Sequence, residues 1–81
     1  MEIEYRKLLG KIREKGITQA QLAEMVGITP STLSAKLNND SFFKQSEIIA
    51  IGDILGISYA EYHDYFFTRK VRKNTNLNKE E

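Results

Sequence analysis

The sequence predicts an all-α fold, a compact bundle of about five short helices. Apolar residues recur at the three- and four-residue spacing of amphipathic helices, and no stretch alternates long enough to form a strand. Glycines and a single proline divide the chain into segments of helical length. Its 81 residues suffice for one small core, and a composition that is 41% hydrophobic and 28% charged is typical of a globular domain.

The first helix is expected over residues 2–15, where Ile3, Leu8 and Ile12 fall toward one face. Gly16 follows a lysine, an order that is common at helix C-termini. The chain is therefore expected to begin with a helix that covers the core.

Two further helices follow, with only a short connection between them. Thr18 can cap the second helix with its hydroxyl, and Gly27 ends it. The third helix opens with Thr29 and Pro30, because a hydroxyl cap followed by proline at the first helical position is a favoured start. Residues 38–40, two asparagines and an aspartate, are expected to close it.

The fourth helix is the most apolar one and is expected over residues 46–55. Ser46 can cap it, and Gly56 stops it. A fifth helix is expected from Ser58 to about Phe67. The folded domain should therefore end at that point.

Charge is distributed unevenly between the expected domain, residues 1–67, and the remaining residues 68–81, which we expect to form a flexible tail. The domain has a formal charge of −2 and the tail one of +3. The tail contains the densest basic cluster of the chain: Arg69, Lys70, Arg72 and Lys73. This cluster either keeps the protein in solution or adds sequence-independent contacts to nucleic-acid phosphates. We favour the first interpretation, because two glutamates end the chain.

The composition argues against several classes of function. Cysteine is absent, and a single histidine, His63, cannot form a zinc site by itself. The chain has no glycine-rich phosphate loop and no carboxylate paired with a base, so we expect no enzyme activity, no metal and no cofactor. No apolar run is long enough to span a membrane and no export signal opens the chain, so we expect a cytoplasmic protein.

The most informative segment is TQAQLAEMVGITPSTLSAKLN, residues 18–38. Gly27 permits the positive φ of a sharp turn between its two helices. The second of these helices carries short, hydroxyl-bearing side chains, and residues 27–39 contain no carboxylate, so a phosphate could approach its N-terminus. The side chains expected to anchor both helices in the core are Leu22, Ala23, Val26, Ile28, Leu33 and Leu37.

This segment resembles the helix-turn-helix of the phage-repressor and Cro-like family, whose lambda-repressor-like DNA-binding domain is a bundle of five helices. TQAQLAEMVGIT is similar to that family's first helix and turn, and STLS to its recognition helix. STLSAKLN together with FFKQSEIIAIGDILGIS resembles small prophage-encoded regulators. The resemblance implies a transcriptional regulator of the repressor type that binds operator DNA as a homodimer. We further expect no small-molecule effector domain and no membrane partner.

The resemblance also assigns positions that contact DNA. The first turn of the recognition helix is expected to meet base edges in the major groove. Gln19 and Lys36 are expected to reach phosphates, Lys36 alternatively a guanine edge, and Ala35 to face the groove. Two asparagines are expected to hold the DNA backbone. The full expected set is Gln19, Thr29, Pro30, Ser31, Thr32, Ala35, Lys36, Asn38 and Asn39.

The chain departs from the family in two respects. Its recognition face lacks the Arg, Gln or Asn side chains that bind bases through two hydrogen bonds, so we expect modest direct readout and a larger contribution from DNA shape. Family members often bury an arginine–glutamate pair between the first helix and the recognition helix. The corresponding positions here are expected to hold Ile12 and Leu37, and an apolar pair can replace a buried ion pair without loss of stability.

The last helix contains five of the eight aromatic residues of the chain. So short a helix cannot bury all of them in a small domain, and the surplus predicts an exposed apolar patch. In the family this helix is a usual dimer surface, and the expected dimer contacts are Tyr59, Tyr62 and Phe66. The alternative function is a protein-interaction module, an anti-repressor or antitoxin-like partner, that uses the same aromatic helix.

Overall fold

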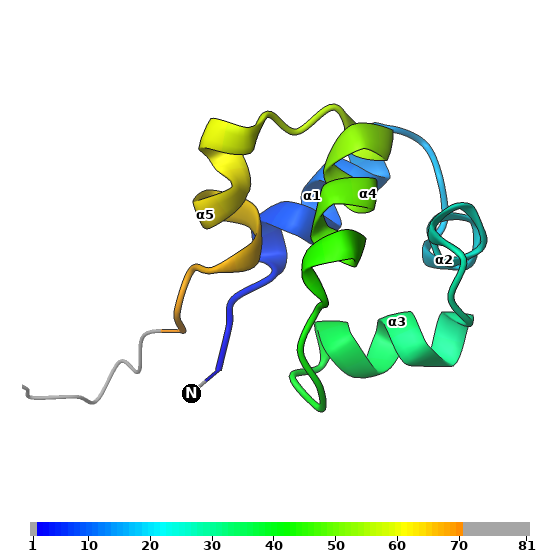
Figure 1. The fold of residues 1–81 in the computed structure, drawn as a ribbon, viewed down its shortest axis with the longest axis horizontal. Helices are drawn as coiled ribbons and strands as arrows, with labels where there is room; N and C mark the ends of the chain where they lie inside the picture. Colours follow the sequence, from blue (N-terminus) through cyan, green and yellow to red (C-terminus); the bar gives the residue numbers. More distant parts are fainter. Residues whose placement is uncertain (1, 71–81) are drawn as a thin grey trace, which may run out of the picture.

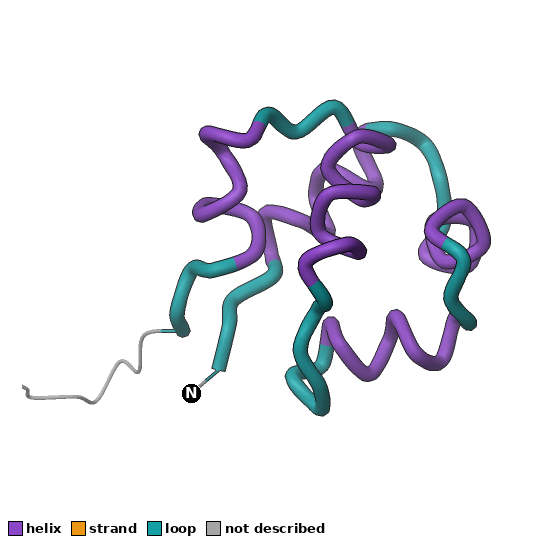
Figure 2. Tube along the Cα trace, viewed as in Figure 1, coloured by secondary structure: helices purple, strands orange, loops and turns teal. Residues whose placement is uncertain are grey.

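The computed structural model describes residues 2–70, and within this range the chain forms five α-helices and one short 3-10 helix (Figure 1). In chain order they are α1 (Arg6–Glu14), α2 (Gln19–Val26), α3 (Pro30–Leu37), α4 (Gln45–Leu55), the 3-10 helix η1 (Tyr59–Glu61) and α5 (Tyr62–Phe66). Figure 2 shows these helices joined by loops, with no strand in the described range. The predicted all-α bundle of about five short helices is confirmed.

A single hydrophobic core lies between the helices. In Figure 1, α3 runs along the lower edge, α2 stands at one end, α5 at the other, and α4 crosses in front of α1. The largest fully buried side chains come from four helices: Leu8 of α1, Leu22 of α2, Leu33 of α3, and Ile51 and Leu55 of α4. Each buried side chain of this size contributes about 1.5–3 kcal/mol, so the core fixes α2 and α3 against the rest of the bundle.

The side chains expected to anchor α2 and α3 do contact this core. They divide into a fully enclosed set and a half-buried set at its margin. Leu22, Ala23 and Leu33 are buried, whereas Val26, Ile28 and Leu37 are half-buried and packed against the core. The predicted anchoring set is confirmed.

The two ends of the described chain pair with each other. Ile3 forms an isolated antiparallel bridge with Arg69, flanked by backbone hydrogen bonds of 2.6 and 3.0 Å. The expectation of a helix from residue 2 is therefore wrong, because residues 2–4 take part in this pairing and α1 begins only at Arg6. The expected domain boundary at residue 67 is too early, since residues 68–70 complete the pairing. Arg72 and Lys73 of the expected tail lie outside the described residues.

The predicted start of α2 is confirmed in detail. The hydroxyl of Thr18 accepts a hydrogen bond from the amide of Gln21 at 3.0 Å, and the side-chain oxygen of Gln21 accepts one from the amide of Thr18 at 2.8 Å. This reciprocal pair satisfies two amides that a helix leaves open. Gly27 ends α2 with φ 92°, a conformation that glycine adopts without steric cost.

The start of α4 differs from the prediction. Ser46 was expected as its cap, but the helix begins one residue earlier, at Gln45, and Lys44 is the capping residue. The reason is Glu47, whose carboxylate accepts a hydrogen bond from the amide of Lys44 at 2.8 Å. A negative charge in the first turn is favourable because it faces the positive end of the helix.

A single fifth helix was expected from Ser58 to about Phe67. The structure instead has the 3-10 helix η1 followed directly by α5. The predicted surplus of aromatic residues is confirmed. Tyr65 and Phe66 are buried, whereas Tyr59 is 86% and Phe67 48% exposed. Tyr59 belongs to η1, which contains no buried residue, whereas both buried rings belong to α5.

Candidate nucleic-acid interface

The connection between α2 and α3 consists of residues 27–29 alone. The amides of Gly27 and Ile28 both donate to the carbonyl of Ala23, at 2.9 and 3.0 Å, and so close the end of α2. Figure 1 shows α2 almost end on and α3 lengthwise, so the two helices cross steeply. Ile28, half-buried, packs against the core at this corner.

The N-terminus of α3 is capped from within. The hydroxyl of Thr29 accepts a hydrogen bond from the amide of Thr32 at 3.1 Å and donates one to the hydroxyl of Thr32 at 2.8 Å. Proline at the first position has no N–H. Ser31 is therefore the first-turn residue whose amide has no hydrogen-bond partner within residues 2–70. The hydroxyl hydrogen of Thr32 is also left free to donate.

The outer face of α3 is polar, uncharged and open. Its exposed side chains are Pro30, Ser31, Thr32 and Ser34, with Ala35 half-buried beside them. Thr29, which precedes the helix, is exposed as well. No carboxylate lies on this face, because residues 27–39 contain none. The expected base-facing residues are thus brought together on one accessible surface.

Gln19 is exposed as the first residue of α2. The cap of α2 occupies the amide of Gln21, so the amides of Gln19 and Ala20 remain directed out of the helix. Gln19 and Arg13 of α1 line the same shallow cavity of about 280 Å³. The start of α2 therefore offers hydrogen-bond donors next to a guanidinium group.

Lys36 does not belong to the exposed face, and its predicted contact with DNA is wrong. The residue is 6% exposed. Its ammonium group donates to the carbonyl of Phe42 at 2.9 Å and lies 3.3 Å from a carboxylate oxygen of Glu47. Lys36 follows the buried Leu33 by three residues and so falls on the inner side of the helix, a spacing that the sequence already contained.

The prediction that Asn39 contacts the DNA backbone is also corrected, because its side chain is engaged within the protein. Asn39 has a positive φ of 67°, and its side-chain amide pairs with the backbone of Ile3 in place of a neighbouring strand. The side-chain oxygen accepts from the amide of Ile3 at 2.8 Å, and the side-chain nitrogen donates to the carbonyl of Ile3 at 3.1 Å. Both ends of the amide are thereby engaged inside the protein. Asn38, by contrast, is exposed and stays a predicted contact.

The structure contains a buried ion pair that the sequence analysis missed. An apolar pair, Ile12 and Leu37, was expected where relatives bury an arginine and a glutamate. Ile12 is indeed buried and Leu37 packs against the core, but Lys36 and Glu47 form an ion pair elsewhere, between α3 and α4. The apolar pair is therefore present at the expected positions, and the buried Lys36–Glu47 pair is an additional feature of the fold.

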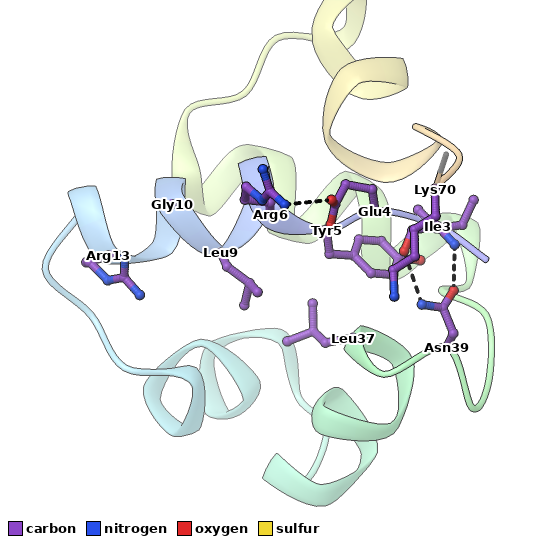
Figure 3. A pocket seen from close by; sticks show the side chains of 10 residues that line it. All are labelled: Ile3, Glu4, Tyr5, Arg6, Leu9, Gly10, Arg13, Leu37, Asn39 and Lys70. Atoms are coloured by element: carbon purple, nitrogen blue, oxygen red, sulfur yellow. Dashed lines mark hydrogen bonds and ion pairs between the residues drawn. The ribbon is translucent and has the colours of Figure 1, made fainter. Parts of the chain in front are cut away.

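A cavity of about 460 Å³ between α1 and the C-terminal end of α3 gathers side chains that the sequence analysis did not connect (Figure 3). Three cationic residues from both ends of the described chain line it: Arg6, Arg13 and Lys70. Leu9 and Leu37 also contribute to its lining. The members from α1, Arg6, Leu9 and Arg13, share a face by helical spacing, but no local pattern indicates Lys70, which arrives through the pairing of residues 68–70 with residues 2–4.

A second cavity, of about 660 Å³ and largely apolar, lies between α4 and the η1–α5 segment. Its lining includes Ile49, Tyr59, Tyr62 and Phe67. Phe66 is 2% exposed and stacks edge-to-face on Phe43 and Tyr62, so its predicted place in a dimer contact is wrong. Tyr59 and the half-buried Tyr62 do reach the surface.

Within residues 2–70, the pKa values of Tyr5, Lys11 and Glu61 are displaced, and these residues belong to neither α2 nor α3. Burial raises the pKa of the Tyr5 phenol. Partial desolvation opposes the charge of Lys11, but the nearby Glu14 and Tyr65 outweigh it and raise the pKa of that ammonium group. Hydrogen bonds from the amide and hydroxyl of Ser58 lower the pKa of Glu61.

Within residues 2–70, no helix is both long and apolar enough to cross a membrane. No curated protein matches the chain. A family model, described as a protein of unknown function (DUF739), matches residues 1–69. Since this match spans most of the sequence, the chain belongs to the DUF739 family.

Proposed function

We propose that the protein binds duplex DNA sequence-specifically through α2 and α3, acting as a helix-turn-helix regulator of the phage-repressor type. The observation that carries the proposal is the outer face of α3. It is exposed and free of carboxylates, and its first turn presents hydroxyl groups and the unpartnered amide of Ser31. A phosphate-bearing ligand meets no charge repulsion there.

In this proposal the first turn of α3 enters the major groove. The hydroxyls of Ser31 and Thr32 bond base edges, and Pro30 and Ala35 offer apolar contact to thymine methyl groups. Gln19 and the open amides at the start of α2 hold a phosphate, as helix N-termini do. Because hydroxyl groups pair with several bases, DNA shape contributes much of the specificity.

The regulator would act by occupying operator DNA and excluding polymerase, in the cytoplasm and without catalysis. A homodimer on a two-fold symmetric site is part of the proposal. The exposed apolar residues around the cavity between α4 and the η1–α5 segment support it, with Tyr59 and Tyr62 as contacts. Ile49 and Phe67, both partly exposed, extend that surface.

The test is selection of bound sequences from random duplexes, followed by affinity measurements with matched variants. Gln19→Ala combined with Ser31→Ala alters the first residue of α2 and the second of α3. Ser46→Ala combined with Asp53→Asn is the control pair, because it alters two exposed polar side chains of α4 that line neither of the two larger cavities. The first pair should weaken binding to the selected site by about 1–3 kcal/mol per lost base contact, and the second should not.

A palindromic motif with half-sites about one helical turn apart would identify a dimeric regulator. Absence of any enriched motif, or equal losses in the two variant pairs, would contradict DNA reading by α2 and α3.

A second candidate function is a protein-interaction module. The specific observation in its favour is the exposure of large apolar side chains beside the cavity between α4 and the η1–α5 segment, above all Tyr59 at 86%. Sedimentation of the protein alone distinguishes the two uses of this surface. Association that Ile49→Asp abolishes indicates a homodimer, whereas a monomer at high concentration favours a different partner.

A further inference from the structure

The cavity between α1 and the C-terminal end of α3 has an apolar centre and charged margins. Figure 3 shows Leu9 of α1 and Leu37 of α3 directed toward each other across it. Both leucines are half-buried, so each retains apolar surface on the cavity side. Contact of such an apolar surface with water is unfavourable in free energy, so covering it with an apolar side chain is favourable.

Positive charge dominates the margins. Arg6 lies 3.4 Å from Glu4, and Lys70 lies 3.6 Å from Glu2, so the cations at one end are already paired. Arg13 lies at the other end (Figure 3), is exposed, and forms no ion pair within residues 2–70. A ligand would therefore find its unopposed positive charge at the Arg13 end.

Gly10 forms part of the wall between these ends. It lies inside α1, where glycine costs about 1 kcal/mol relative to alanine. A Cβ atom at this position would meet nothing within 4 Å, so packing inside the chain does not require glycine there. What a glycine does allow at an open helix surface is close approach of another backbone.

We propose that this groove is a docking site for an acidic segment of a partner protein. The segment inserts an apolar side chain between Leu9 and Leu37, places a carboxylate against Arg13, and passes its backbone over Gly10. A nucleic-acid phosphate backbone would use Arg13 but would gain nothing from the two leucines. The groove is separate from the outer face of α3, although Arg13 also lies beside Gln19 at the start of α2, and docking of the segment does not depend on DNA binding.

The experiment is selection of short random displayed peptides on the full chain, with counter-selection against Arg13→Glu. The recovered peptides should carry an apolar residue flanked by aspartate or glutamate. A synthetic peptide of the recovered sequence should bind Arg13→Glu at least about tenfold more weakly, the loss of one charge-assisted contact. Lys15→Glu is the matched control, because Lys15 is an exposed cation next to α1 that does not line the groove.

Two further readouts separate docking from a folding defect. In amide NMR spectra, the peptide should shift the signals of Leu9, Gly10 and Leu37. Gly10→Ala should raise the melting temperature of the protein and yet lower its affinity for the peptide. A purely structural role of Gly10 does not produce this combination.

Three outcomes would overturn the proposal. One is the recovery of no peptide that survives counter-selection, and another is a peptide that shifts Ile49, Tyr59 and Phe67 instead. The third is a loss of binding to random-sequence duplex in Arg13→Glu together with no acidic peptide, which would assign the groove to a phosphate backbone.

Discussion

The ammonium group of Lys36 lies 3.3 Å from a carboxylate oxygen of Glu47, and the two side chains are only 7% and 10% exposed. The same carboxylate oxygen accepts a hydrogen bond from the amide of Lys44, and the ammonium group of Lys36 also donates one to the carbonyl of Phe42. The pair therefore joins the end of α3 to the start of α4 and fixes the loop between them. In this way the pair adds to the packing of Leu33 in holding α3 against the bundle.

Removing one partner of the buried pair should destabilise the protein strongly. Lys36→Met should lower the free energy of unfolding by about 3–5 kcal/mol, because it leaves the carboxylate of Glu47 buried without its counter-charge. Urea denaturation measures this loss. Lys36→Met with Glu47→Leu should recover part of it, since an apolar pair needs no compensation. A loss below about 0.5 kcal/mol, as expected for an exposed site such as Lys15→Met, would contradict the role of the pair.

Asn39 should contribute to stability in two ways, by adopting a positive φ and by pairing with the backbone of Ile3. Asn39→Ala removes two side-chain hydrogen bonds and places a Cβ-bearing, non-polar residue at φ 67°. Asn39→Gly removes the same bonds but adopts that φ freely. We expect Asn39→Ala to be the less stable variant by about 1 kcal/mol, measured by thermal melting. Equal stabilities would show that the backbone conformation relaxes when the side chain is lost.

Substitutions at Phe66 and Tyr59 should distinguish an effect on folding stability from an effect on self-association. Phe66→Ala removes a ring that is 2% exposed and should cost about 3–5 kcal/mol in the free energy of unfolding. Tyr59→Ala alters a side chain that is 86% exposed and should change that free energy by less than about 0.5 kcal/mol. Chemical denaturation measures both, and sedimentation then tests Tyr59→Ala for weakened self-association. A strongly destabilised Tyr59→Ala would place that ring in the core.

The sequence predicted those features that depend on neighbouring residues. The caps of α2 and α3 and the turn at Gly27 were foreseeable because each involves residues within three or four positions of one another. The inward position of Lys36 could have been inferred from its spacing from Leu33, but its partner Glu47 could not, because it is remote in the chain. The partner of Asn39, Ile3, is equally remote, and no local pattern indicates that pairing.

The same distinction applies to the candidate site. The exposed face of α3 follows from helical periodicity about Leu33, so its hydroxyl residues could be assigned from the sequence. The groove that contains Arg13 and Lys70 could not be predicted as a whole, because Leu37 and Lys70 join the residues of α1 there only in the folded chain.

The carboxyl group of Glu61 should make stability depend on pH. Its Oε1 accepts hydrogen bonds from both the amide and the hydroxyl of Ser58, each at 3.1 Å, and these bonds lower the pKa of Glu61 in the folded state. The ionised form is therefore favoured by folding. The stabilisation is fully present above the pKa that Glu61 has in the unfolded chain, and it is lost as pH falls through the lower pKa of the folded state.

Glu61→Gln keeps an acceptor oxygen but carries no charge. The difference in urea midpoint between the wild type and Glu61→Gln should therefore shrink as the pH falls through that interval. Ser58→Ala removes only the hydroxyl and should raise the pKa of Glu61 part of the way toward its ordinary value, followed by the carboxyl carbon signal in NMR. A Glu61 carboxyl that titrates at its ordinary value in the wild type would show that the Ser58–Glu61 cap is not maintained in solution. In that case η1, in which the exposed Tyr59 lies, would lack its capping interaction.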